Sequence, residues 1–205
     1  MTRYMLIGVI ILLQACASPI YYAKRIQGQV VDEQTGEPIE GAIIVAQWIL
    51  FHQGLGHSGH DSRIRVVETV TNKNGYYTIH GSPMVRAIPF TELHFYDPKI
   101  SVFKKGYSPT SFANDFVGNR SGMIRSSNWD GKKLQLSRPP FLLEKQASDL
   151  GIFFHGIYGI NADNWNFCPK MLFAIHKEKQ RLMAKGIIHF LPNTPNTIPP
   201  DINTF

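Results

Sequence analysis

The chain has 205 residues, of which 43% are hydrophobic and 18% are charged, and its formal net charge is +6 at pH 7. These proportions are typical of globular proteins and argue against wholesale disorder. The positive charge is dispersed in small clusters at residues 104–105, 132–133 and 177–181. Nucleic-acid binding typically needs a denser basic stripe, so we expect no nucleic-acid partner.

The N-terminal segment has the features of an export signal. Arg3 precedes an apolar run over residues 4–13, which has the length of a signal-peptide core but not of a membrane span. The run ends in Leu-Gln-Ala-Cys at residues 13–16, which resembles the lipobox of bacterial lipoproteins. The resemblance implies lipidation of Cys16. An ordinary signal peptide that happens to end near a cysteine is the alternative.

A lipidated cysteine implies a membrane-anchored protein. We expect residues 1–15 to be removed as a signal peptide and residues 16–25 to form a short tether to the membrane. Ala17-Ser18 after the cysteine resembles outer-membrane sorting, so the expected location is the bacterial outer membrane, facing the periplasm or the cell surface. Cys168 would then have no disulfide partner, and we expect it to be a buried small hydrophobic residue.

From Ile26 onwards, apolar and alternating runs separated by turn residues predict short strands. The expected strands are 26–32, 42–51, 63–71, 76–80, 100–104 and 133–136. The run 42–51 is the most continuously apolar, which is typical of a central strand, and Asn74-Gly75 predicts a hairpin between its two flanking strands. Short strands with frequent turns favour a mainly β protein with a β-sandwich fold.

Three short motifs stand out in the strand region. They are Gly-x-Val-x-Asp-x-x-Thr-Gly-x-Pro-Ile-x-Gly-Ala at residues 28–42, Thr-Asn-x-Asn-Gly-x-Tyr at 71–77 and Lys-Gly-Tyr at 105–107. They resemble the signatures of the carboxypeptidase regulatory-like domain, in which an aspartate more often stands at the position of Asn72. The resemblance implies a Greek-key, transthyretin-like β-sandwich over residues 26–138. It also implies a folding or interaction module, with no catalysis of its own.

Beyond residues 139–140, both proline, the apolar residues recur at steps of three and four, which predicts helices. The first helix covers residues 143–157 and is weakened by two glycines. The second begins at Pro169 and ends at residues 185–186. We expect an α-helical hairpin that packs on the sandwich as a helical appendage over residues 139–191.

The end of the chain has a different composition. Residues 186–191 are expected to add a short strand. Residues 192–205 are rich in Pro, Asn and Thr, so we expect a disordered tail there.

The sequence contains one candidate for metal binding. His52, His57, His60 and Asp61 lie in a glycine-rich loop, and imidazoles with a carboxylate suit zinc or copper. A solvated, mobile loop is the alternative, because such a loop seldom supplies the supporting hydrogen bonds that metal-bound histidines need. We therefore predict no metal and no other cofactor.

Familiar catalytic motifs are missing from the sequence. It contains no His-x-x-Glu, His-Glu-x-x-His, Gly-x-Ser-x-Gly, Cys-x-x-Cys or P-loop sequence. We therefore predict no catalytic residues and no enzyme. His155 and His176 lie on the two predicted helices, where they could face each other as interfacial histidines.

Three aromatic residues are candidates for partner binding. Trp129, Tyr158 and Trp165 lie in predicted loops, with Phe167 nearby. Exposed aromatic side chains in loops could stack on a sugar ring or contact a partner protein. Packing between the helical hairpin and the sandwich is the alternative explanation for them.

These features together predict a non-catalytic, lipid-anchored envelope protein. Its β-sandwich would be an interaction or scaffolding module for an envelope protein or a polysaccharide. The alternative is a periplasmic binder of a metal or small ligand through the loop 52–61, and a hydrolase without a recognised motif is a third hypothesis.

Overall fold

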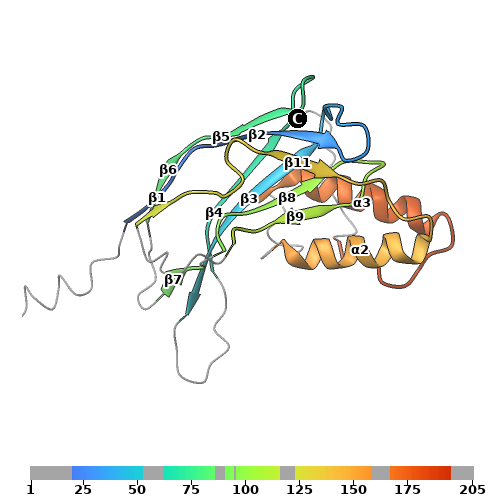
Figure 1. Ribbon diagram of the computed structural model, residues 1–205. Coiled ribbons are helices and arrows are strands. Elements are labelled where there is room, and N and C mark those ends of the chain that lie inside the picture. The colour runs from blue at the N-terminus through green and yellow to red at the C-terminus, as the bar shows by residue number, and fades with distance from the viewer. Residues whose placement is uncertain are drawn as a thin grey trace, which may run out of the picture.

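A computed structural model describes residues 20–52, 62–85, 91–94, 96–115, 123–157 and 167–194. Within these ranges the strands come first and the helices last (Figure 1). The elements are β1 (Ile20–Ala23), β2 (Ile26–Asp32), β3 (Ile43–His52), β4 (Ser62–Val70), β5 (Tyr76–Ile79), β6 (Ser82–Val85), β7 (Thr91–Leu93), β8 (Lys99–Phe103), β9 (Thr110–Phe112), β10 (Ile124–Arg125), β11 (Lys133–Leu136), α2 (Leu143–Gly156) and α3 (Pro169–Met183).

The strands form sheets that enclose one apolar core. One layer is a five-stranded sheet of order β4-β3-β8-β9, with β7 paired to the end of β3, and the other layer comprises the sheets β11-β2-β5 and β10-β1-β6. Both layers contribute to the core, for example through Trp48 of β3, Val30 of β2 and Tyr21 of β1. The chain is therefore mainly β, with a β-sandwich-like fold followed by two helices, as the sequence predicts.

β3 is the central strand, also as predicted. It pairs with β4 along one edge and with β8 along the other. Ile44, Ala46 and Trp48 enter the core of the sandwich, whereas Val45 on the opposite face packs against the helices. Because β3 is buried on both faces, nearly every side chain along it is apolar.

The predicted hairpin between the strands that flank Asn74-Gly75 is wrong. β4 pairs with β3 whereas β5 pairs with β2, so this turn connects two different sheets. The turn itself is tight, since Asn72 Oδ1 accepts two backbone N–H groups and Gly75 has a φ of 72°. A Cβ at Gly75 would lie 2.5 Å from the carbonyl oxygen of Val30. Asn-Gly thus specifies the local reversal of the chain, not the pairing of the strands that it joins.

Part of the expected tether over residues 16–25 is folded. Ile20–Ala23 forms β1, which pairs antiparallel with β6 and parallel with β10. Tyr21 and Ala23 are buried in the core, so this short strand is fixed along both edges and on one face. The sequence pattern places the start of the folded structure at Ile26. The structure places it earlier, at β1.

The end of the described chain packs against the helices. Residues 186–191 form no strand, in contrast to the expectation. The carbonyl oxygen of Phe190 would lie 2.5 Å from a Cβ on Gly151, so the glycine in α2 permits this close approach. The side chain of Thr194 lies 3.1 Å from His176 Nδ1 and is hydrogen-bonded to it, and Thr194 is only 2% exposed. The expected disorder of the tail is therefore wrong for residues 192–194.

α2 and α3 pack together on the outer face of the five-stranded sheet (Figure 1). A second apolar core forms there, with Leu150 and Phe154 from α2, Ile175 from α3 and Phe103 from β8. Cys168 is buried in the same core, as expected. The predicted pair of helices packed on the sandwich is thus confirmed.

A glutamate of the sheet caps the start of α3. Glu68 in β4 accepts the backbone N–H groups of Lys170 at 3.1 Å and Met171 at 2.7 Å, while Pro169 at the first helical position has no N–H. The carboxylate also faces the positive end of the helix dipole. Burial nonetheless raises the pKa of Glu68, because the loss of water outweighs these two hydrogen bonds.

A lysine of the same sheet caps the end of α2. Lys99 in β8 donates from Nζ to the carbonyl oxygen of Gly156 at 2.7 Å. A positive charge is favourable at this end of a helix, where carbonyl groups have no partner within the helix. Each helix is therefore tied to the five-stranded sheet by one charged side chain at one of its ends.

Asp32, the last residue of β2, organises the turn that follows it. Its Oδ1 accepts the N–H groups of Gln34 and Thr35, and its Oδ2 accepts the Tyr107 hydroxyl at 3.0 Å and pairs with Arg138 at 2.7 Å. The Arg138 guanidinium also lies 4.4 Å from the centre of the Tyr107 ring. The hydrogen bond from Thr35 is the main cause that lowers the pKa of Asp32 below its usual value.

We predict that Asp32→Asn lowers the thermal midpoint of unfolding at pH 7. The lowered pKa means that the ionised carboxylate stabilises the fold at pH values above about 3.8 and that this contribution is lost as the pH falls through the folded-state pKa. The difference between wild type and variant should therefore shrink on acidification, as followed by circular dichroism from pH 7 to pH 3. Glu33→Gln, at an exposed position in the same turn, is the matched control. An unchanged midpoint for Asp32→Asn at pH 7 would refute the prediction.

We predict that Glu68→Ala destabilises the fold by about 2 kcal/mol, because two N–H groups at the start of α3 lose their acceptor. Denaturant unfolding at pH 7 measures the change. Glu68→Gln keeps an uncharged acceptor oxygen and should cost less. Equal stability of Glu68→Ala and wild type would show that the cap is dispensable.

Candidate functional site

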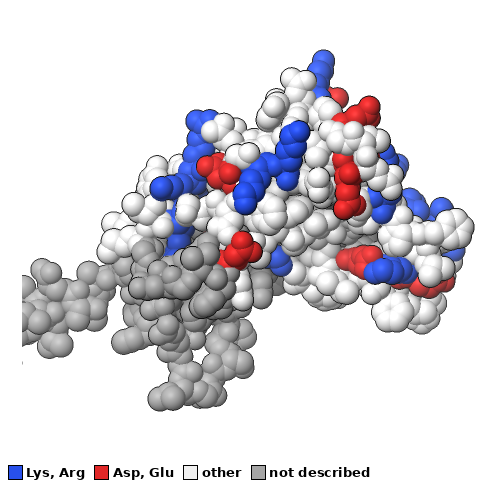
Figure 2. Space-filling model, viewed as in Figure 1, with Lys and Arg blue, Asp and Glu red and all other residues white. Residues whose placement is uncertain are grey.

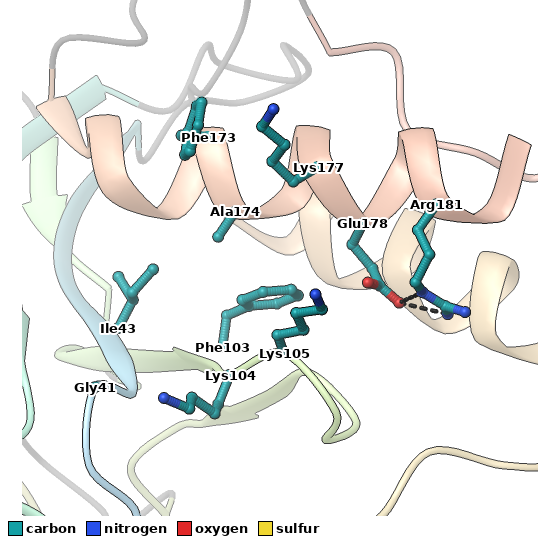
Figure 3. A pocket seen from close by; sticks show the side chains of 10 residues that line it. All are labelled: Gly41, Ile43, Phe103, Lys104, Lys105, Phe173, Ala174, Lys177, Glu178 and Arg181. Atoms are coloured by element: carbon teal, nitrogen blue, oxygen red, sulfur yellow. Dashed lines mark hydrogen bonds and ion pairs between the residues drawn. The ribbon is translucent and has the colours of Figure 1, made fainter. Parts of the chain in front are cut away.

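A groove lies between α3 and the adjoining end of the five-stranded sheet (Figure 3). Its cavity measures about 370 Å³, within the size range of sites that hold a small ligand or a few side chains of a partner. The sheet contributes the ends of β3 and β8 with the residues beside them, and α3 contributes one side of its middle and last turns.

The floor of the groove is apolar. Ile43 and Phe103 are directly opposite each other in the antiparallel pair β3–β8, so their side chains lie on the same face of the sheet. Phe173 and Ala174, consecutive residues of α3, complete the apolar lining. Figure 3 shows the Phe103 ring below α3, close to Ala174. The groove therefore offers aromatic and aliphatic surface to a ligand.

The rim of the groove is mainly basic. It carries four cationic side chains and one carboxylate, a formal excess of three positive charges. These residues are Lys104, Lys105, Lys177, Arg181 and Glu178. Lys104 and Lys105 follow directly after β8, whereas Lys177 and Glu178 are consecutive residues of α3 and Arg181 lies one turn later.

The Glu178 charge is already neutralised within the protein. Arg181 donates to the Glu178 carboxylate at 2.6 and 2.9 Å, and it also donates to the Gln146 side-chain oxygen. The hydrogen bond to Glu178 is the main cause that raises the pKa of Arg181. This ion pair closes one end of the groove and leaves the lysines as its dominant charges.

Two lysines hold ammonium groups that are available to a ligand. Lys177 Nζ lies 5.3 Å from the centre of the Phe173 ring, which keeps the ammonium above the apolar floor. Lys105 is exposed, and neither lysine has an ion pair with any residue in the part of the chain that the structure describes. Lys104 is engaged, since it donates to the carbonyl oxygen of Glu40 at 2.5 Å.

Trp129, a predicted partner-binding residue, lies at the margin of the core. It is partly buried and packs edge-on against Phe112, with 4.9 Å between ring centres. Its indole N–H donates to the carbonyl oxygen of Ala113 at 2.8 Å. These contacts lie within the sandwich and not between it and the helices, and partner binding by Trp129 stays a prediction.

The other predicted site residues fall outside the described ranges. These are Cys16, His57, His60, Asp61, Tyr158 and Trp165, and for His52 only the backbone, at the end of β3, is described. Lipidation, metal binding by the loop and partner binding by the two aromatics therefore stay predictions. The ranges that the structure describes contain no group of three or more His, Cys, Asp or Glu side chains arranged to hold a metal ion.

His155 and His176 make separate contacts. His155 is exposed on α2, where its ring lies edge-on to that of Phe154. His176 is hydrogen-bonded to Thr194 and to Gln180, and burial is the main cause that lowers its pKa. The two histidines are therefore positioned by different neighbours and form no site together among the described residues.

The groove was not predicted from the sequence. Its signals were present as two clusters of basic residues, 104–105 and 177–181, which in the sequence served only as an argument against a nucleic-acid partner. The helical spacing of Phe173, Lys177 and Arg181 places all three on one side of a helix. Only the packing of α3 on β8, however, brings the two clusters to one apolar floor.

The charged side chains elsewhere are mixed. On the face shown in Figure 2, Lys and Arg residues are dispersed among Asp and Glu. None of the helices described is both long enough and apolar enough to cross a membrane.

Comparison with known proteins gives a distant likeness of fold. The sequence matches no protein-family model and no curated protein. Among solved structures, a streptococcal ancillary pilin is 16% identical with a TM-score of 0.29, over 60% of this chain and 30% of the pilin. The C-terminal domain of the shaft pilin SpaA from Lactobacillus rhamnosus GG is 11% identical with a TM-score of 0.26, over 58% of this chain and 98% of that domain. 3-Chlorocatechol 1,2-dioxygenase from Rhodococcus opacus 1CP is 14% identical with a TM-score of 0.29, over 60% of this chain and 61% of the enzyme.

The chain thus spans less than two thirds of the ancillary pilin and of the dioxygenase. The likeness concerns the β-sandwich-like fold of pilin domains alone.

Proposed function

We propose that the protein is a non-catalytic interaction module of the bacterial envelope, anchored by a lipid on Cys16. In this proposal the groove between α3 and β8 binds an acidic segment of a partner protein. The observation that carries it is the combination, in one cavity, of an apolar floor with lysine ammonium groups that have no carboxylate partner in the described chain.

The chemistry of the groove favours a peptide segment. A carboxylate on the segment would pair with Lys105 or Lys177 at the rim, and a neighbouring apolar side chain would cover Phe103 and Phe173. A neutral polysaccharide could stack on the aromatic floor, but it has no carboxylate to pair with the lysines of the rim. An acidic segment with an apolar residue satisfies both the rim and the floor.

The carboxypeptidase regulatory-like, transthyretin-type Greek-key assignment of the sandwich is part of the proposal. Contacts between the three sequence motifs support it. The Asp32 carboxylate of the first motif accepts the Tyr107 hydroxyl of the third. The Thr71 hydroxyl of the second motif donates to the Ile39 carbonyl oxygen and accepts the Ala42 N–H, both in the first. A domain known as an interaction module suits a protein that acts by binding.

The proposed anchor rests on the resemblance of residues 13–16 to a lipobox. The outer membrane, with the module facing the periplasm or the cell surface, is the proposed location. An anchored module need not carry an activity of its own, because it can hold a partner at the membrane by binding alone.

We predict that reversing the two available charges weakens binding of an acidic peptide to the purified protein. The probe is a fluorescein-labelled peptide of alternating aspartate and leucine, and fluorescence anisotropy measures its dissociation constant. Lys105→Glu with Lys177→Glu should raise that constant about tenfold, since two attractive charges become repulsive.

Lys73→Glu with Lys133→Glu is the matched control, because it changes the net charge equally at exposed positions outside the groove. Equal weakening by both double variants would indicate attraction by net charge alone. No binding of the peptide to the wild type, or preferential binding of an acidic polysaccharide, would contradict the proposed ligand class.

We predict that Cys16→Ser abolishes metabolic labelling with palmitate and moves the protein from the membrane fraction to the soluble fraction of cells. The serine hydroxyl does not replace the thiol to which the lipid is attached. Cys168→Ser, which leaves the proposed attachment site intact, should keep the label. Label that persists in Cys16→Ser would refute the anchor.

A further inference from the structure

The sheet β10-β1-β6 has an apolar outer face. β1 alternates between exposed and buried residues, so Ile20 and Tyr22 point away from the core. Val85 is opposite Ile20 in β6, and Ile124 is opposite Tyr22 in β10. These four side chains and the adjacent Met123 are between 47% and 62% exposed. We call this set of five side chains the outer patch.

The outer patch is unusual within its own layer. The neighbouring sheet β11-β2-β5 belongs to the same side of the sandwich, yet the residues exposed on its strands are mostly polar, namely Gln27, Lys133 and Gln135 beside the exposed Tyr76. A polar outer face of this kind is typical of an antiparallel or mixed sheet that meets water. Contiguous exposed apolar side chains, in contrast, commonly mark a surface that contacts something other than water.

We propose that the outer patch rests on the interfacial region of a lipid bilayer when the protein is anchored. This inference relies on the proposed lipidation of Cys16. Ile20, the first residue of β1, is four residues beyond Cys16, and four extended residues reach at most ~14 Å. The sheet that carries the patch is therefore the one that the anchor holds nearest to the membrane.

The composition around the outer patch suits a bilayer surface. Lys24 and Arg25, directly after β1, are both exposed, and cations near a membrane surface are attracted to anionic headgroups. Tyr22 combines an aromatic ring with a hydroxyl, a combination favoured at the boundary between acyl chains and water. Aliphatic side chains, an interfacial tyrosine and flanking cations are the elements of a peripheral membrane contact.

A tryptophan placed in the outer patch tests this contact. The full chain is produced in a lipoprotein-processing bacterial host and reconstituted into phosphatidylethanolamine–phosphatidylglycerol vesicles, with or without brominated acyl chains that quench tryptophan fluorescence. Val85→Trp adds a reporter to the patch. Gln135→Trp adds one at an exposed position of the neighbouring sheet, and the wild-type emission provides the background for both.

We expect brominated vesicles to remove most of the added emission of Val85→Trp and little of that of Gln135→Trp. Adding Ile20→Asp and Ile124→Asp to Val85→Trp should restore its emission, because charged residues would lift the patch out of the interface. All three positions are exposed, so these changes leave the core intact.

Failure of the anchor and failure of the patch give different results. If the protein carries no palmitate label, the proposed anchor is wrong and this inference fails with it. If the protein is labelled but Val85→Trp is quenched no more than Gln135→Trp, the membrane contact is refuted. The proposed anchor is not affected by that result. Concentration-dependent dimerisation in detergent that Val85→Asp abolishes, together with unquenched Val85→Trp, would assign the patch to a second copy of the chain and would likewise refute the membrane contact.

Discussion

Two charged side chains of the five-stranded sheet, Glu68 and Lys99, determine where the helical layer lies. The first turn of α3 leaves N–H groups without partners and the last turn of α2 leaves carbonyl groups without partners, and in each case a side chain from the sheet supplies the missing partner. The sign of each charge also agrees with the dipole of the helix that it caps. Apolar packing alone would tolerate some sliding of a helix across the sheet. Hydrogen bonds at a helix end fix its position along its axis.

The groove is a consequence of this fixed position. α3 crosses the sheet so that Phe173 and Ala174 stand opposite Phe103 and Ile43, and the gap between them remains open to solvent at a basic rim. The ion pair of Arg181 with Glu178 adds to the effect, because it removes the one carboxylate that would compete with an acidic ligand for the lysines. Apolar contact area supplies affinity in such a site, while the positions of the charges determine which ligands are accepted.

Local sequence patterns predicted the elements well and their partners poorly. β2 and β11 have the predicted bounds, and both helices lie within three residues of theirs, because periodicity and turn residues act over a few positions. Glu68 was not recognised as a cap, since it lies 102 residues before the N–H group of Lys170, and nothing near it in the sequence indicates that contact. β1 was assigned to a tether because four residues are too few to show an alternation. A prediction of the groove would require both the packing of the helix on the sheet and the basic clusters. Neither of these alone indicates it.

The place of β1 in its sheet has a mechanical consequence. It is the middle strand of β10-β1-β6, with one antiparallel and one parallel neighbour. A pull on the N-terminus, directed along β1, therefore loads the backbone hydrogen bonds to both neighbours in shear and at the same time. An edge strand would instead peel away one bond after another. Tension on the N-terminal segment is thus shared between two ladders of backbone hydrogen bonds, and Tyr21 transmits it to the core. β1 is therefore a mechanically suitable point at which to attach a protein by one end.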